Sequence, residues 1–178
     1  LMHLFAPYSV DFGHLVTLER CFGTLKECRV AEACKVLKCW TNGWATSHRY
    51  HEDKLLPCLL GCNNGSDSLN HYLLCPHLYA LWRFLSGGVA DENPLVRWGL
   101  IHPNKLTYHY MACIFSGYHA VRRDFNASAI VFTDNQMALS SAQLRRAWSV
   151  FADAFKVEAR ELALQQRQFS LPDFLIEI

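Results

Sequence analysis

The sequence predicts a mostly α-helical domain, a small helical unit with a Cys3His zinc knuckle and long C-terminal helices. About half of its 178 residues are apolar, which is enough to fill a core. Apolar residues recur at helical spacing in several stretches, but no uninterrupted apolar run reaches the ~18 residues that a membrane-spanning helix requires. Three cysteines and a histidine lie close together in mid-chain. We expect one compact unit with segments 1–54, 55–86 and 87–178, the second holding the knuckle.

Two helices are expected before the knuckle. A short helix is expected around 14–22, after an irregular start that contains a proline and a glycine. A longer helix is expected over 25–40, where apolar residues recur every three or four positions. Asn42-Gly43 should end this helix, because both residue types tolerate the backbone that follows a helix.

The middle of the chain is expected to begin as loops and continue as a broken helix. Residues 45–68 are polar and rich in turn-forming residues. The next helix should begin near Asp67 or Ser68, since either side chain can cap it. Pro76 removes a backbone donor and crowds the preceding turn, so we expect a break or kink there.

The last segment should contain two long helices. Loops at 87–94 and 102–104 precede a helix over 105–125, and residues 129–133 favour a short strand. Ser140 or Ser141 is expected to cap the final helix. Its apolar stripe has spacings of three and four residues and consists of Leu144, Trp148, Phe151, Phe155 and Leu162.

The cysteine and histidine spacing predicts a metal site. Cys58 and Cys62 are separated by three residues, a glycine among them, so a turn can bring both thiols together. His71 and Cys75 are four residues apart, which on a helix places both side chains on one face. Thiolate and imidazole ligands suit Zn²⁺, and four protein ligands leave no open coordination position. The expected cofactor is therefore a structural zinc ion.

Other histidines and cysteines leave alternatives open. His51 and His77 are nearby substitutes as the histidine ligand, and the three cysteines can also be interpreted as buried thiols without a metal. We expect reduced thiols, because a domain of this size and apolar content does not require disulfides. Four cysteines at no recurrent ligand spacing are expected in the core: Cys21, Cys28, Cys34 and Cys39.

Around this cluster the sequence resembles a known family over roughly residues 35–85. The stretch Trp40-Thr41-Asn42-Gly43-Trp44-Ala45-Thr46-Ser47-His48-Arg49-Tyr50, followed by Cys58…Cys62…Asp67-Ser68-Leu69-Asn70-His71-Tyr72…Cys75-Pro76, carries the resemblance. It is similar to the zinc-binding segment that follows the polymerase in non-LTR (LINE-like) retrotransposon reverse transcriptases, in versions found in dinoflagellates and their relatives. The resemblance implies that Cys58, Cys62, His71 and Cys75 bind the metal and that the segment contacts nucleic acid.

The sequence departs from such enzymes in its carboxylates. A polymerase holds two metal ions with adjacent carboxylates, and these 178 residues contain no Asp-Asp pair. Phe132-Thr133-Asp134-Asn135 matches only half of the corresponding turn, and a turn or a helix cap is the ordinary role for Asp134. We therefore expect no catalytic residue, no enzyme activity and no small-molecule substrate.

Basic and aromatic residues precede the cluster. The stretch from Arg20 to Arg49 contains six basic and two acidic residues, which gives it a local charge of +4, compared with +1 for the whole chain. Basic groups interleaved with flat rings are typical of surfaces that neutralise phosphates and stack unpaired bases. The alternative is a solvated helix face beside buried tryptophans, and Arg122-Arg123 and Arg145-Arg146 are weaker candidates. The candidate RNA-contacting residues are Lys35, Lys38, Trp44, His48, Arg49 and Tyr50.

Together these features predict a non-enzymatic, RNA-contacting structural component of a large ribonucleoprotein, such as an organellar ribosome, derived from a retrotransposon protein. Expected partners are ribosomal or other structured RNA and neighbouring proteins, with the apolar stretch 172–178 as a docking candidate. The alternatives are the C-terminal part of an active reverse transcriptase and a zinc-folded protein-interaction domain. The mitochondrion is the favoured location and the nucleus the alternative. The first residue is Leu1 rather than Met, as expected for a processed product or a fragment.

Overall fold

The computed structural model describes residues 15–88, 90–128 and 138–161. Regular secondary structure within these ranges is helical, apart from one isolated antiparallel bridge between Pro57 and Ser66. This confirms the mostly α-helical class. No helix in the described ranges is long and apolar enough to cross a membrane. The helices are α2 (Leu15–Lys26), α3 (Val30–Trp40), α4 (Leu69–Leu74), α5 (Pro76–Leu85), α6 (Pro94–Arg97), α7 (Lys105–Ala127) and α8 (Ser141–Glu161).

The prediction of one helix over 25–40 is wrong, because the structure breaks it after Lys26. Arg29 has an extended backbone, with φ −63° and ψ 149°, and it caps the start of α3. The backbone N–H of Arg29 donates to a carboxylate oxygen of Glu32 at 3.4 Å, so the chain leaves the helical path and enters it again. Apolar spacing continues across this break, which is why periodicity alone does not reveal it.

The predicted break at Pro76 is confirmed. Cys75 has φ −57° and ψ 123° between α4 and α5, and Pro76 is the first residue of α5, where its missing N–H has no helical partner to lose. Of the two expected caps of α4, Ser68 is the one used. Its side-chain oxygen accepts a hydrogen bond from the backbone N–H of His71 at 3.2 Å. The cap thus fixes the turn of helix that carries His71.

Helix α6 was not expected from the sequence, and it begins at Pro94, the last residue of the loop expected over 87–94. Pro94 starts this helix, and the side chain of Asn93 caps it by accepting from the N–H of Leu95 at 2.9 Å. An asparagine followed by a proline at the first helical position was the missed signal.

Several sequence features lie outside the described residues, namely the strand expected over 129–133, Asp134, Leu162 and the stretch 172–178.

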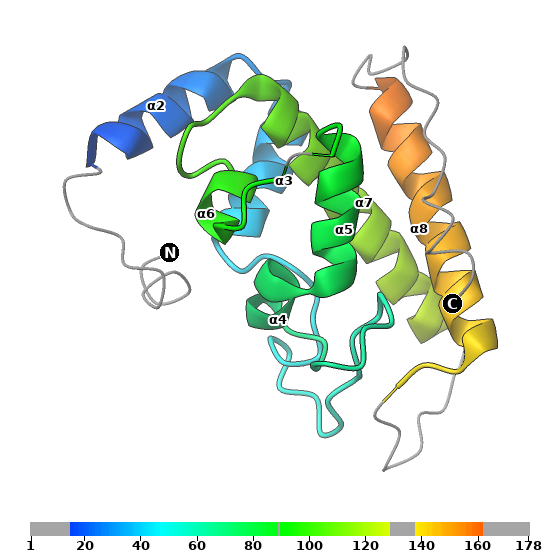
Figure 1. The fold of residues 1–178 in the computed structure, drawn as a ribbon. Coiled ribbons are helices and arrows are strands. Elements are labelled where there is room, and N and C mark those ends of the chain that lie inside the picture. The colour runs from blue at the N-terminus through cyan, green and yellow to red at the C-terminus, as the bar shows by residue number, and fades with distance from the viewer. Residues whose placement is uncertain (1–14, 89, 129–137, 162–178) are drawn as a thin grey trace.

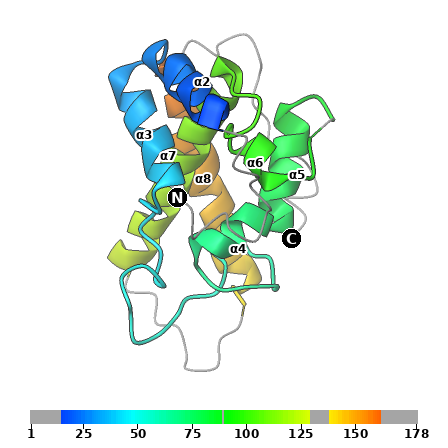
Figure 2. The ribbon, with the colours of Figure 1, turned by 90° about the vertical axis from the view of Figure 1, so that its left-hand side faces the viewer.

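Helix α7 is the central element, and α3 and α8 both pack against it (Figures 1 and 2). One continuous cluster of buried side chains draws on residues from all three expected segments. At its centre the ring of Trp44 lies 4.5 Å from that of Tyr118 on α7 and 5.2 Å from that of Tyr72 on α4. Large aromatic rings in such clusters contribute much of the buried area. The segment between α3 and α4 therefore packs against α7 through Trp44.

Candidate metal centre

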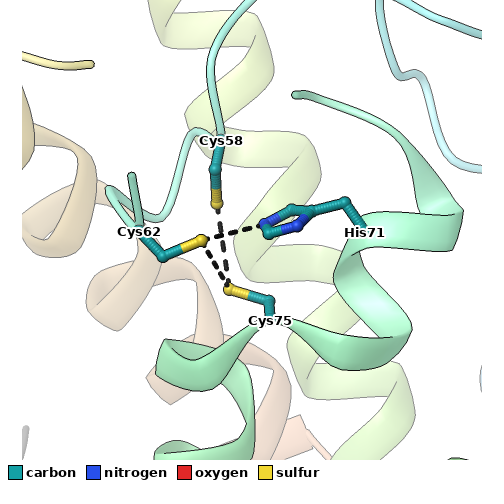
Figure 3. Close-up of side chains that lie close together, drawn as sticks. All are labelled: Cys58, Cys62, His71 and Cys75. Carbon is teal, nitrogen blue, oxygen red and sulfur yellow. Dashed lines mark hydrogen bonds between the residues drawn. The ribbon is translucent and has the colours of Figure 1, made fainter. Parts of the chain in front are cut away.

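Cys58, Cys62, His71 and Cys75 converge on one point, and their ligand atoms all lie within 4.8 Å of one another. Figure 3 shows two thiols arriving from the loop before α4, the imidazole from α4, and the third thiol from the joint between α4 and α5. The sulfur of Cys75 lies 3.8 Å from that of Cys58 and 3.6 Å from that of Cys62. Nε2 of His71 lies 3.0 Å from the Cys62 sulfur. This Cys3His group can hold one metal ion.

A tight turn brings the two loop cysteines together. The carbonyl of Cys58 accepts from the N–H of Gly61 at 3.0 Å, and the N–H of Cys58 donates to the carbonyl of Gly65 at 3.0 Å. Gly61 has φ +82°, a conformation that L side chains rarely adopt, and a Cβ there would overlap Cδ1 of Leu144 on α8. The glycine between the cysteines therefore permits both the turn and its close packing on α8.

Tyr72 joins the loop to the helix that supplies His71. Its hydroxyl accepts from the N–H of Leu59 at 3.2 Å and donates to Oδ1 of Asp67 at 2.8 Å. Tyr72 itself is buried, and it directly follows His71 in α4. The residues between Cys58 and Cys62 are thus held against α4 by a side chain next to a ligand, in addition to the four ligands themselves.

The three thiols are unequal in acidity. Hydrogen bonds from Cys58 and then Cys75 lower the pKa of the Cys62 thiol, so Cys62 gives up its proton first. The hydrogen bond to Cys62, a second to Cys75 and burial raise the pKa of Cys58. Loss of the proton from all three buried thiols would require a cation close to them, because unpaired charge is costly away from water. The donor set therefore fits a divalent ion.

The two alternative histidines lie outside this group. Nδ1 of His77 is 2.7 Å from the carbonyl oxygen of Leu60, so its ring supports the loop rather than joining the ligands. His51 is exposed. No disulfide links the cysteines, all eight of which lie within the described ranges. Of the expected core thiols Cys21 and Cys39 are buried, whereas Cys28 is half-buried and Cys34 is exposed.

Cys34 and Trp44 correct the sequence-based expectations. Cys34 was expected in the core, but it falls on the solvent face of α3. Trp44 was a candidate for stacking on RNA, but its side chain is fully buried and offers no ring face to a base. Its indole N–H donates to the sulfur of Cys39 at 3.3 Å, which further fixes it inside the core.

The remaining candidate RNA contacts differ in availability. Lys35 forms an ion pair with Glu158 of α8, so its charge is already engaged within the domain. Lys38, His48, Arg49 and Tyr50 are exposed, at the end of α3 and in the segment that follows it. The structure therefore leaves these four side chains accessible to a partner.

Asp67 is the important site residue that sequence reasoning missed, since it was considered only as a helix cap. Its carboxylate is fully buried and accepts from the hydroxyls of Tyr72 and Tyr118, both at 2.8 Å, and from the N–H of Ser47 at 2.7 Å. Burial raises its pKa, against the opposing effect of these hydrogen bonds. Asp67 thus joins the segment after α3 to α4 and α7. No local pattern predicts this role, because two of its partners are 20 and 51 residues away.

The fold and the site define a small helical domain with a Cys3His cluster that can hold a metal ion. Comparisons with protein-family models, curated proteins and solved structures find no match. The function is therefore inferred from the residues of the chain itself.

Gly65→Ala is expected to weaken metal binding about 10-fold, in the range typical for residues that orient ligands. A Cβ at Gly65 would overlap the His71 ring at Nδ1 and push the imidazole out of place. Competition with a chromophoric zinc chelator measures the affinity. Asn63→Ala, at an exposed position in the same loop, is the control and should bind as the unmodified protein does. Equal affinities for the two variants would contradict this account of His71.

Proposed function

We propose that the protein is a zinc-stabilised, non-enzymatic component of a large ribonucleoprotein that contacts RNA. The observation that carries the proposal is the geometry of the Cys3His group. In a tetrahedral site with Zn–S bonds of about 2.3 Å, neighbouring sulfurs lie about 3.8 Å apart. The sulfur of Cys75 lies 3.8 Å and 3.6 Å from its two neighbours. The contact between Cys62 and His71, at 3.0 Å, would have to open by about 0.5 Å for a Zn–N bond of ordinary length.

The zinc ion proposed here is structural. Four protein ligands complete its coordination shell, and the three cysteines are buried, so no open position would remain for water or substrate. The ion would join a loop that has no regular secondary structure to the start of α4 and α5. In such sites the free energy of metal binding stabilises the folded state directly.

The proposal of RNA contact is supported by the exposed residues next to this segment and by the sequence resemblance. Lys38, His48, Arg49 and Tyr50 combine positive charge with an exposed ring beside the loop that leads to the cluster. The resemblance over residues 35–85 is to a segment that contacts nucleic acid. We propose descent from such a retrotransposon segment and reuse in an assembly such as an organellar ribosome, with the mitochondrion as the location.

Zinc analysis and RNA crosslinking of the native protein test the proposal. We expect one zinc ion per chain by mass spectrometry of the purified protein, and ultraviolet crosslinks to structured RNA after isolation from its source. A protein that lacks stoichiometric zinc and keeps its helical circular dichroism in a chelator would contradict the structural metal. A zinc-loaded, folded protein that isolates with other proteins and without crosslinked RNA would favour an interaction domain instead.

The coding sequence separates the proposal from the reverse-transcriptase alternative. A polymerase with paired aspartates, encoded upstream of Leu1 in the same reading frame, would identify this chain as the C-terminal part of an active retrotransposon enzyme. A gene without that polymerase supports reuse as a separate component.

A further inference from the structure

One face of α7 carries a stripe that the sequence analysis did not single out. Phe115, His119 and Arg123 are spaced by four residues, so they lie along one side of the helix. The rings of Phe115 and His119 are 4.1 Å apart, and Arg123 is exposed one turn further on. The Phe115 end of this stripe faces the segment that follows α3, because the Phe115 ring packs against that of Trp44.

Two other parts of the chain bring cations to the same stripe. The ammonium group of Lys38, near the end of α3, lies 5.8 Å from the centre of the Phe115 ring. The guanidinium of Arg49 donates to the carbonyl of Trp44 at 3.5 Å, and the Trp44 ring packs against Phe115 with centroids 6.3 Å apart. Figure 2 shows the segment after α3 running beside the C-terminal half of α7.

The local electrostatics agree with this placement. Burial lowers the pKa of His119 to about 4, and the charges of Lys38, Arg123 and Arg49 contribute to the lowering. Three cations from separate parts of the chain therefore act on one side chain. Nε2 of His119 is buried and has no hydrogen-bond partner among the described residues.

Two nearby carboxylates are engaged with other cations. Glu52, close to Arg49 in sequence, forms an ion pair with Arg122, and Asp124, next to Arg123, accepts two hydrogen bonds from Arg146, both at 2.7 Å. These acids are therefore already paired within the domain, which leaves the charges of Lys38, Arg49 and Arg123 available to an external anion.

We propose that Lys38, Arg49, Tyr50, His119 and Arg123 form a binding surface for single-stranded or looped RNA. The three cations contact successive phosphates, and an unpaired base stacks on Tyr50, which is 56% exposed and whose ring centre lies 5.4 Å from the Arg49 guanidinium. The exposed ring favours RNA over an acidic protein as the partner. RNA supplies flat bases that stack on the ring as well as negative charges for the cations, whereas an acidic protein supplies only the charges. This surface deepens the proposed RNA-contacting function and depends on it.

The test compares charge reversal on and off this surface. Zinc-loaded protein is titrated into a fluorescent single-stranded oligouridine and the binding is followed by anisotropy at several salt concentrations. Arg123→Glu is expected to weaken binding at least about 10-fold and to reduce the slope of log K against log salt by about 0.7, the contribution of one phosphate contact. Arg83→Glu, an equal charge change at an exposed position of α5, should change the affinity less than about 2-fold.

Three outcomes overturn the surface, and they differ in what they imply for the function. Wild-type binding that Arg123→Glu and Arg83→Glu weaken equally would overturn the surface while RNA contact stands. Absence of oligouridine binding by the folded, zinc-loaded protein would overturn the surface, whereas absence of RNA crosslinks in the native protein would contradict the proposed function as well. Binding of polyglutamate but not of RNA, with loss in Arg123→Glu, would instead assign the surface to an acidic protein. Tyr50→Ala should weaken RNA binding without changing the salt slope, since it removes stacking and no charge.

Discussion

Cys58→Ser is expected to lower the free energy of unfolding by about 3–5 kcal/mol, because metal affinity at a structural site is folding energy. Cys58 is only 1% exposed, so serine would leave a hydroxyl in a site shaped for a thiolate. The loop that it anchors contains no helix or strand of its own, so the loss of a ligand removes one of its few fixed points. For a domain of this length the change corresponds to a fall in melting temperature of about 10–15 °C. Thermal unfolding followed by circular dichroism measures it.

Cys34→Ser is the matched control for this experiment. Cys34 undergoes the same atomic change at an exposed position on α3, far in sequence from the metal ligands. We expect it to keep the zinc content and melting temperature of the unmodified protein. A strong chelator should lower the melting temperature of Cys34→Ser protein to that of Cys58→Ser protein, and should leave Cys58→Ser unchanged. Equal melting temperatures for both variants in zinc-containing buffer would contradict a structural metal.

The cluster could be predicted from sequence because its information is local. All four ligands lie between Cys58 and Cys75, and the capped turn at Ser68 together with the proline after Cys75 sets the geometry of the second pair. The spacing of four residues predicts that His71 and Cys75 share one helix face, whereas the structure places Cys75 just past the end of α4, at the non-helical joint before α5. The same locality explains why the long helices α7 and α8 were predicted within a few residues of their ends.

The rest of the site could not be predicted, because it depends on contacts between distant parts of the chain. Trp44 has the residue type of a stacking platform, but its burial is decided by Tyr118, which lies on α7. The charges of Lys38, Arg49 and Arg123 all act on His119 because α3 packs on α7, whereas the sequence alone shows Arg123 only as part of an arginine pair. Residue type thus indicates what chemistry a side chain can perform, while tertiary packing determines which side chains face solvent.

Asp67→Ala is expected to destabilise the domain by about 3–5 kcal/mol. The substitution leaves the hydroxyls of Tyr72 and Tyr118 and the N–H of Ser47 buried without an acceptor, and each such group costs about 1–3 kcal/mol. Asp53→Ala is the control at an exposed position, with an expected effect under about 0.5 kcal/mol. Urea unfolding measures both. A decrease in the free energy of unfolding for Asp67→Ala as small as that of the control would show that this carboxylate does not stabilise the fold.

Asp67→Asn separates the hydrogen bonds of Asp67 from its charge. Burial raises the carboxyl pKa above its ordinary value of 3.8, so the folded protein holds this proton more tightly than the unfolded chain does. That contribution to stability is complete below 3.8 and is lost as the pH rises through the folded-state pKa. Asparagine does not titrate, and the contributions of the other titrating groups to the pH dependence cancel when the two proteins are compared. The free energy of unfolding of the unmodified protein, measured in urea at a series of pH values, should therefore fall relative to that of Asp67→Asn as the pH rises from 3.8. A difference between the two proteins that stays constant with pH would contradict the raised pKa.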